Sequence, residues 1–166
     1  MGTNGSDSGP GSAAAPWRTL QRAADLVPPG ATVYVRDGTY AGFTMRRSGT
    51  AAAPITFAAY PQEQPVVDGQ DAVAYTVRLV GVSYVNLVGL TVTGGFAERH
   101  AGGGVAIESS ANVQVRDGVL RDNKAFGVRS SASTNVLIEN NDITGNAANV
   151  SSNVAALSSV VAATLG

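Results

Sequence analysis

The sequence predicts an all-β fold, a parallel β-solenoid of about five stacked coils with a short helix at its N-terminal end. Three segments repeat one alternation of polar and apolar residues: Ser83–Leu87, Ala111–Val115 and Thr134–Ile138. A second pattern repeats around Val105, Val128 and Val150, which are 23 and 22 residues apart. A period of this length with β-branched residues and Gly or Asn at the corners is typical of stacked coils, since one coil cannot bury its own apolar side.

The composition indicates one domain without a strong charge. The 166 residues carry 11 basic and 12 acidic side chains, for a net charge of −1. This balance argues against a nucleic-acid partner, because phosphate binding needs a basic stripe. The chain has no cysteine, so disulfides and thiolate metal sites do not hold it together. No apolar run reaches the roughly 18 to 20 residues of a membrane span, so no membrane partner is expected.

The N-terminal segment is expected to have two parts. Residues 1–15 are rich in Gly, Ser and Ala and predict a flexible lead-in without ordering contacts. Its first residues, Met1-Gly2-Thr3, have the form of an expression start placed on a trimmed domain, and no signal sequence opens the chain. Residues 16–27 predict a helix that covers the open first coil, because Pro16 suits a first helical turn and apolar side chains follow at helical spacing.

Short alternating segments over residues 31–150 predict the coils. The side chains expected to stack in a narrow core are Val33, Val35, Ile55, Phe57, Val77, Leu79, Val85, Leu87, Val92, Val105, Ile107, Val113, Val115, Leu120, Val128, Val136, Ile138 and Ile143. Asn123 and Asn146 are 23 residues apart and predict a stacked ladder inside a corner, and Asn112 and Asn135 are expected to be structural as well.

The tail, residues 151–166, has two interpretations. Ser152-Asn153-Val154 repeats the first pattern and predicts a last coil. Val154, Leu157, Val161 and Leu165 also fit helical spacing and predict a C-terminal capping helix. If the tail is an open coil, its unpaired edge favours an end-to-end homodimer.

Several phrases resemble a known superfamily. They are Gly5-Ser6-Asp7-Ser8-Gly9-Pro10-Gly11, Pro16-Trp17-Arg18-Thr19-Leu20, Pro29-Gly30-Ala31-Thr32-Val33-Tyr34-Val35, Asp37-Gly38-Thr39-Tyr40, Tyr60-Pro61, Val67-Asp68-Gly69 and the Asn-rich repeat at 135–146. Together they resemble the right-handed parallel β-helix proteins of the pectate-lyase-like superfamily. The resemblance implies a right-handed coil and a secreted, extracellular protein, since many members are secreted bacterial enzymes that cleave acidic polysaccharides by β-elimination or hydrolysis.

The chain also departs from that superfamily. Its enzymes usually have about twice as many coils, and the lyases that this start resembles carry an aspartate-bound calcium ion and a basic residue on later coils. The repeats here hold no adjacent Asp pair, and the strand that usually precedes Gly5-Ser6-Asp7 is missing. We therefore expect a short module of a polysaccharide-active lineage without full catalytic machinery, either the front half of a longer helix or an engineered minimal one. The alternatives are a compact polysaccharide lyase and a structural scaffold without a ligand.

Candidate site residues share one outward face, because in-register coils stack equivalent positions about 4.8 Å apart. One outward column contains Thr44, Arg78, Ala106, Arg129 and Ser151, and its neighbour contains Arg46, Val80, Glu108 and Ser131. In the resembling superfamily this face holds the sugar groove. We expect catalytic roles for Lys124, Arg129 and Arg78, and substrate-binding roles for Glu108, His100, Arg99 and Arg46.

The proposed chemistry is β-elimination from a uronate. An arginine would neutralise the carboxylate by bidentate hydrogen bonding, and Lys124 or His100 would take the C5 proton. The competing interpretation is that these charges are solvated surface groups that prevent sheet-to-sheet association. No metal ligand is assigned, although calcium remains a candidate cofactor at the corner acids Asp117, Asp122, Glu139 and Asp142, which also suit plain turns.

Overall fold

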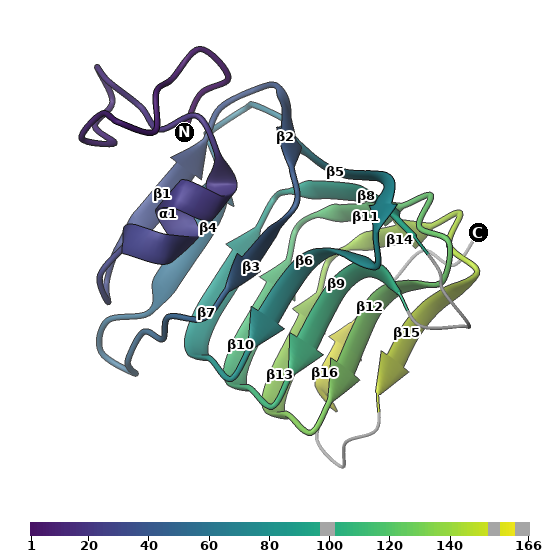
Figure 1. Cartoon of the computed structure of the whole chain (residues 1–166). Helices are drawn as coiled ribbons and strands as arrows, with labels where there is room; N and C mark the ends of the chain where they lie inside the picture. The colour runs from purple at the N-terminus through teal and green to yellow at the C-terminus, as the bar shows by residue number, and fades with distance from the viewer. Residues whose placement is uncertain (97–101, 153–156, 162–166) are drawn as a thin grey trace.

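A computed structural model describes residues 1–96, 102–152 and 157–161. The described strands form three sheets that wind into a solenoid, with the N-terminal segment and helix α1 (Leu20–Leu26) at one end and β15 and β16 at the other (Figure 1). Every pairing between these strands is parallel. The predicted all-β parallel solenoid with one short N-terminal helix is confirmed.

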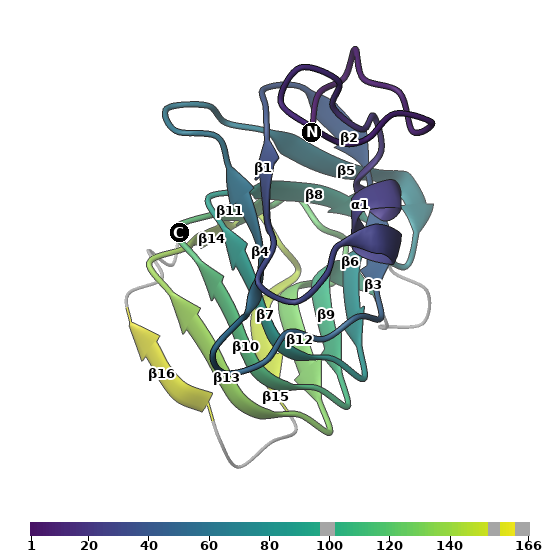
Figure 2. The ribbon, with the colours of Figure 1, turned by 90° about the vertical axis from the view of Figure 1, so that its left-hand side faces the viewer.

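The sheets are built from strands that recur every third element. The first sheet contains β1 (Thr32–Val35), β4 (Ile55–Ala59), β7 (Ser83–Val88), β10 (Ala111–Arg116), β13 (Thr134–Glu139) and β16 (Leu157–Val161), which lie side by side in Figure 2. The second contains β2 (Thr39–Ala41), β5 (Val66–Val73), β8 (Thr91–Gly95), β11 (Val119–Arg121) and β14 (Asp142–Thr144). The third contains β3 (Phe43–Met45), β6 (Tyr75–Val80), β9 (Gly103–Glu108), β12 (Phe126–Ser131) and β15 (Ala148–Ser152).

The register follows the repeats of the sequence. Val113 pairs with Val85 on one side and with Val136 on the other. Val128 pairs in the same way with Val105 and Val150. Each of the eighteen predicted core side chains is at most 7% exposed. Burying one such side chain contributes roughly 1.5 to 3 kcal/mol, so this stacked core is the main source of stability.

The predicted helix boundaries are wrong at the N-terminal side. The helix begins at Leu20 and not at Pro16, and Thr19 is its N-cap, whose hydroxyl accepts the N–H of Arg22 at 3.2 Å. Pro16 and Trp17 instead lie in the preceding segment, where the Trp17 indole donates to Gly9 O at 2.8 Å. Thr19 has an extended backbone and a hydroxyl that accepts a backbone N–H of the first turn, which are the features of a good N-cap. The helix therefore starts after Thr19 and not at the proline three residues earlier.

The helix covers the first coil as expected. Leu20, Ala23 and Ala24 are buried against the core. The Gln21 amide pairs with the free edge of β3, accepting from Thr44 N at 2.8 Å and donating to Thr44 O at 3.0 Å. One side chain therefore provides the hydrogen bonds that a preceding strand would provide.

The expectation that residues 1–15 lack ordering contacts is also wrong. The Asp7 carboxylate accepts the backbone N–H groups of Arg18 and Thr19, both at 2.9 Å, and the Thr19 hydroxyl at 2.6 Å. Backbone bonds join Gly2 to Trp17 and Ser6 to Pro16. These contacts join positions up to 15 residues apart, and composition alone does not reveal them.

The tail contains strand β16, which pairs with β13 in the first sheet. Its register places Leu157 beside Val136, whereas the repeat of Ser152-Asn153-Val154 predicted Val154 at that position. Residues 97–101, 153–156 and 162–166 lie outside the described residues. In the described part of the chain, no helix has the length and apolarity that a membrane span requires.

Candidate functional site

The outer face of the third sheet brings the predicted columns together. Ala106 pairs with Arg78 on β6 and with Arg129 on β12, so the two arginines flank it on the coils to either side. Glu108 lies beside Val80 and Ser131 in the neighbouring column. With a strand spacing of about 4.8 Å, the backbones of Arg78 and Arg129 are roughly 9 to 10 Å apart.

Arg78 is held by an ion pair across adjacent strands. Its Nη2 lies 2.6 Å from Glu108 Oε2, and the two side chains are 40% and 29% exposed. Charge-assisted hydrogen bonds of this length fix the guanidinium in place. A partly exposed pair of this kind adds little to folding stability, so its main effect is to hold a cation and an anion on this face.

Arg129 is held by a tyrosine two strands away. Its Nη1 donates to the Tyr75 hydroxyl at 2.6 Å, so the two side chains together span β9, which lies between β12 and β6. The β9 residues beneath this path are small: Gly103 pairs with Tyr75, and Ala106 is only 1% exposed. In the described residues, no carboxylate forms an ion pair with Arg129. We call this arrangement the Arg–Tyr bridge.

Sequence reasoning missed Tyr75. The two bridge residues are 54 positions apart, and no repeat relates an arginine in one coil to a tyrosine two coils earlier. The usable signal was the small residues Gly103, Gly104 and Ala106, since small side chains on a middle strand allow long ones to pass over it.

Lys124 lies at the corner before β12 and faces the end of β5. Its Nζ is 3.3 Å from Asp71 Oδ2, and its side chain is 56% exposed. Asp71 adopts a left-handed conformation, with φ of 51°. The ammonium is therefore ion-paired with a carboxylate of β5 and open to solvent.

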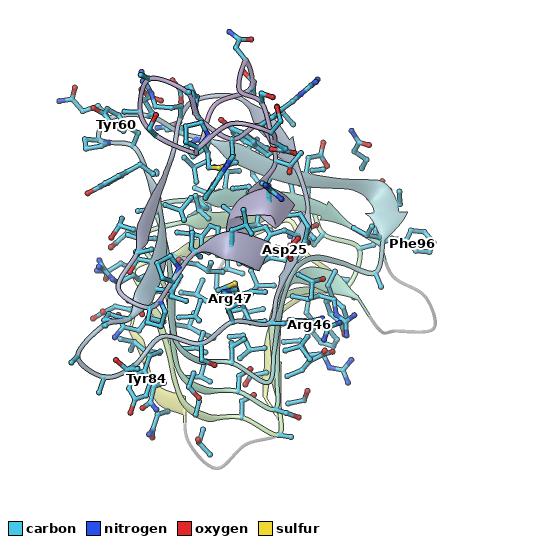
Figure 3. All side chains as sticks on the ribbon, turned by 60° about the vertical axis from the view of Figure 1, so that its left-hand side comes forward. Asp25, Arg46, Arg47, Tyr60, Tyr84 and Phe96 are labelled. Atoms are coloured by element: carbon cyan, nitrogen blue, oxygen red, sulfur yellow. The ribbon has the colours of Figure 1, made fainter. Side chains whose placement is uncertain are left out.

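The remaining predicted site residues are Arg46, Arg99 and His100. Arg46 follows β3, is exposed, and projects from one side of the solenoid (Figure 3). Arg99 and His100 lie outside the described residues, so the structure does not place them.

The corner acids show the geometry of turns. Asp117 and Asp122 have φ of 57° and 56°, a conformation that short polar side chains tolerate. Each pairs with the arginine before it, Arg116 at 2.7 Å and Arg121 at 3.1 Å. Within the described ranges, no three His, Asp or Glu side chains gather closely enough to hold a metal ion.

The asparagine ladders are confirmed as structural. Asn123 is 2% exposed, and its Nδ2 donates to Asn146 Oδ1 at 2.9 Å. Its Oδ1 accepts Gly95 N at 3.0 Å. On the first sheet, Asn135 Nδ2 donates to Asn112 Oδ1 at 3.2 Å. The Asn123 amide thus satisfies buried corner groups that the strands leave unpaired, whereas the Asn112–Asn135 pair lies on the surface.

Comparison with known proteins gives the family. The family described as "Pel9A-like, right handed beta helix region" matches residues 1–156. Pectate lyase PEL9 of Emericella nidulans is 38% identical over 71 residues, which are 41% of this chain and 17% of that protein. The uncharacterized protein YwoF of Bacillus subtilis is 32% identical over 138 residues, which are 78% of this chain and 28% of that protein.

Solved structures have the same architecture. The crystal structure of pectate lyase Pel9A superposes with a TM-score of 0.73 at 23% identity, covering 88% of this chain and 39% of that one. Alginate lyase from Paenibacillus superposes with a TM-score of 0.62 at 26% identity, covering 75% and 41%. The chain therefore spans well under half of the length of each of these four proteins.

These matches confirm the resemblance seen in the sequence and the right-handed coil that it implied. The chain belongs to the Pel9A-like right-handed β-helix family, whose pectate- and alginate-lyase-like fold supports a polysaccharide-active lineage.

Proposed function

We propose that the third-sheet face binds an acidic polysaccharide through Arg78 and Arg129, and that this chain is a glycan-binding β-helix module of an extracellular, secreted protein. One observation carries the proposal: two arginines occupy equivalent positions two coils apart, and each guanidinium is already held by a partner, Glu108 or Tyr75. Held guanidinium groups lose less conformational freedom when they bind a carboxylate.

The charge of this face supports an acidic ligand. The described charged side chains on its strands and directly after β3 are three cations, Arg46, Arg78 and Arg129, and one anion, Glu108, so the face has a net charge of +2. The neighbouring corner pair of Lys124 and Asp71 adds no net charge. The whole chain has a net charge of −1, so positive charge is concentrated here. A uronate polymer offers one carboxylate per sugar, and a planar guanidinium matches a carboxylate in two parallel hydrogen bonds.

The described residues favour binding over cleavage. Elimination needs a base as well as carboxylate neutralisation. Lys124, the candidate base, is paired with Asp71 and largely exposed, which are features of a solvated cation. The alternative of a compact lyase predicts a rise in ultraviolet absorbance from unsaturated uronate products, lost in Lys124→Ala.

The test is a calorimetric titration with oligogalacturonate and oligoalginate. We expect the parent protein to bind at least one of them and Arg129→Ala to weaken that binding roughly tenfold. Arg116→Ala is the matched control, because Arg116 lies on the first sheet and is 40% exposed beside Asp117. The control should bind like the parent. Absence of binding by folded parent protein, or equal losses in both variants, would overturn the proposal, and product formation would replace it with the lyase.

A further inference from the structure

The first sheet carries a second groove with a different chemistry. A shallow groove of about 350 Å³ lies over β7, β10 and β13, and its polar walls are formed by Tyr84, Asn86, Asn112, Gln114 and Asn135, with Leu137 at one end. None of the residues lining it carries a charge. This distinguishes the groove from the third-sheet face, where every polar contact described above involves a charged side chain.

Two stacked columns of side chains form the groove. Asn86, Gln114 and Leu137 pair in register and point outward between core residues. Tyr84, Asn112 and Asn135 form the adjacent column, each one position after a paired residue. The Asn86 amide donates to the Thr56 hydroxyl at 3.2 Å, and in the described part of the chain the Gln114 amide has no side-chain hydrogen bond. The groove thus presents amide donors and acceptors at a regular spacing along the solenoid axis.

Tyr84 is the unusual member of its column. Tyr84, Asn112 and Asn135 all have left-handed backbones, with φ of 56°, 53° and 52°. Asparagine tolerates this conformation, whereas it is unfavourable for a bulky aromatic residue. The local backbone therefore favours asparagine at position 84, and the tyrosine costs conformational energy there. Such a cost is often found at functional positions.

We propose that this groove binds an uncharged glycan chain that runs along the solenoid axis and stacks a sugar ring on Tyr84. A neutral sugar presents hydroxyls that both donate and accept, as do the amides of Asn86 and Gln114. Its ring also has an apolar face that suits the face of an aromatic side chain, and tyrosine adds a hydroxyl at its tip. A polyuronate would gain no ion pair in a groove without cations.

This site is separate from the one proposed above. Figure 3 shows Tyr84 on one side of the solenoid and Arg46, which belongs to the third-sheet face, on the other. A polymer that mixes neutral and acidic sugars could contact both faces, but each site has its own residues and its own probe. Failure of one proposal leaves the other standing.

The experiment compares Tyr84→Asn with Arg129→Ala. Cellohexaose and xylohexaose serve as uncharged probes, and oligogalacturonate as the charged one, with chemical-shift titration as the readout. Asparagine already occupies this position in the next two coils, so Tyr84→Asn should fold and melt at least as high as the parent. We expect the variant to bind an uncharged probe roughly tenfold more weakly than the parent does. Arg129→Ala should bind that probe like the parent.

Three results would overturn the inference. The first is no saturable shift with either uncharged probe on folded parent protein. The second is equal affinity of parent and Tyr84→Asn, which would make the ring a packing group only. The third is a dimer in light scattering that Tyr84→Asn dissociates, which would assign this face to a second copy of the chain.

Discussion

At the scale of single residues, the third-sheet face has paired side chains before any ligand binds. Glu108 holds Arg78 in an ion pair, but it also places a negative charge where a uronate carboxylate would bind. The same residue therefore orients one guanidinium and opposes an acidic ligand. Which effect is larger can be measured by removing the charge without changing the shape of the side chain.

We predict that Glu108→Gln binds oligogalacturonate roughly twofold to fivefold more tightly, since a partly exposed ion pair is worth about 0.2 to 1 kcal/mol. Calorimetric titration gives the affinity. Glu139→Gln is the control, because it removes the same charge from the first sheet. Weaker binding by Glu108→Gln alone would contradict this prediction and show that Glu108 favours binding, either by orienting Arg78 or by contacting the glycan as its sequence-based assignment to substrate binding implies.

The core makes an equally local prediction. Val115 is 4% exposed, whereas Gln114 points outward on the same strand. Val115→Asp should lower the free energy of unfolding by at least about 3 kcal/mol, because it removes apolar burial and places an unpaired charge in the core. Urea denaturation measures the change, and Gln114→Asp should lie within about 0.5 kcal/mol of the parent. Similar midpoints for the two variants would disprove the register of the first sheet.

At the scale of elements, the helix and the lead-in act as one cap. Asp7 accepts hydrogen bonds from the Thr19 hydroxyl and from backbone N–H groups just before the helix, and these bonds lower the pKa of its carboxyl. The side chain that starts the helix at Thr19 is thus oriented by a residue 12 positions earlier. Loss of these hydrogen bonds should therefore destabilise the lead-in and the helix together.

The pH dependence of this cap has a defined sign. Because the pKa of Asp7 is lower in the folded state, its contribution is fully present above its unfolded value of 3.8 and is lost as pH falls through the folded value. We predict that Asp7→Asn lowers the melting temperature at neutral pH and that the difference from the parent disappears toward about pH 2. Thermal melts across this range provide the test. Asp142→Asn, at an exposed position of β14, is the control, and a difference that persists unchanged in acid would contradict the role of Asp7.

At the scale of the whole molecule, repetition decides what the sequence can predict. Val85, Val113 and Val136 occupy equivalent positions in repeats, so their stacking could be predicted from spacing alone. The outward positions of Arg78 and Arg129 followed from the same register. Contacts between unlike residues of different coils, such as Arg129 with Tyr75, do not repeat and could not be predicted.

The ends of the solenoid were predictable only in part, for the same reason. A repeat rule does not apply where the repeat stops, and the contacts of Asp7 and Gln21 depend on the folded arrangement of neighbouring segments. At the other end, Leu157 takes the place predicted for Val154 beside Val136. The sequence predicted either a strand or a helix there, because its apolar spacing fits both. It could not give the register in which the strand pairs with β13.

Chemical-shift mapping with trigalacturonate on backbone-assigned protein tests whether the third-sheet face binds acidic glycans. We predict that the largest shifts fall on the outward positions of β6, β9 and β12, centred on Arg78, Ala106 and Arg129. Shifts confined to the groove around Tyr84, or to the N-terminal cap, would contradict it.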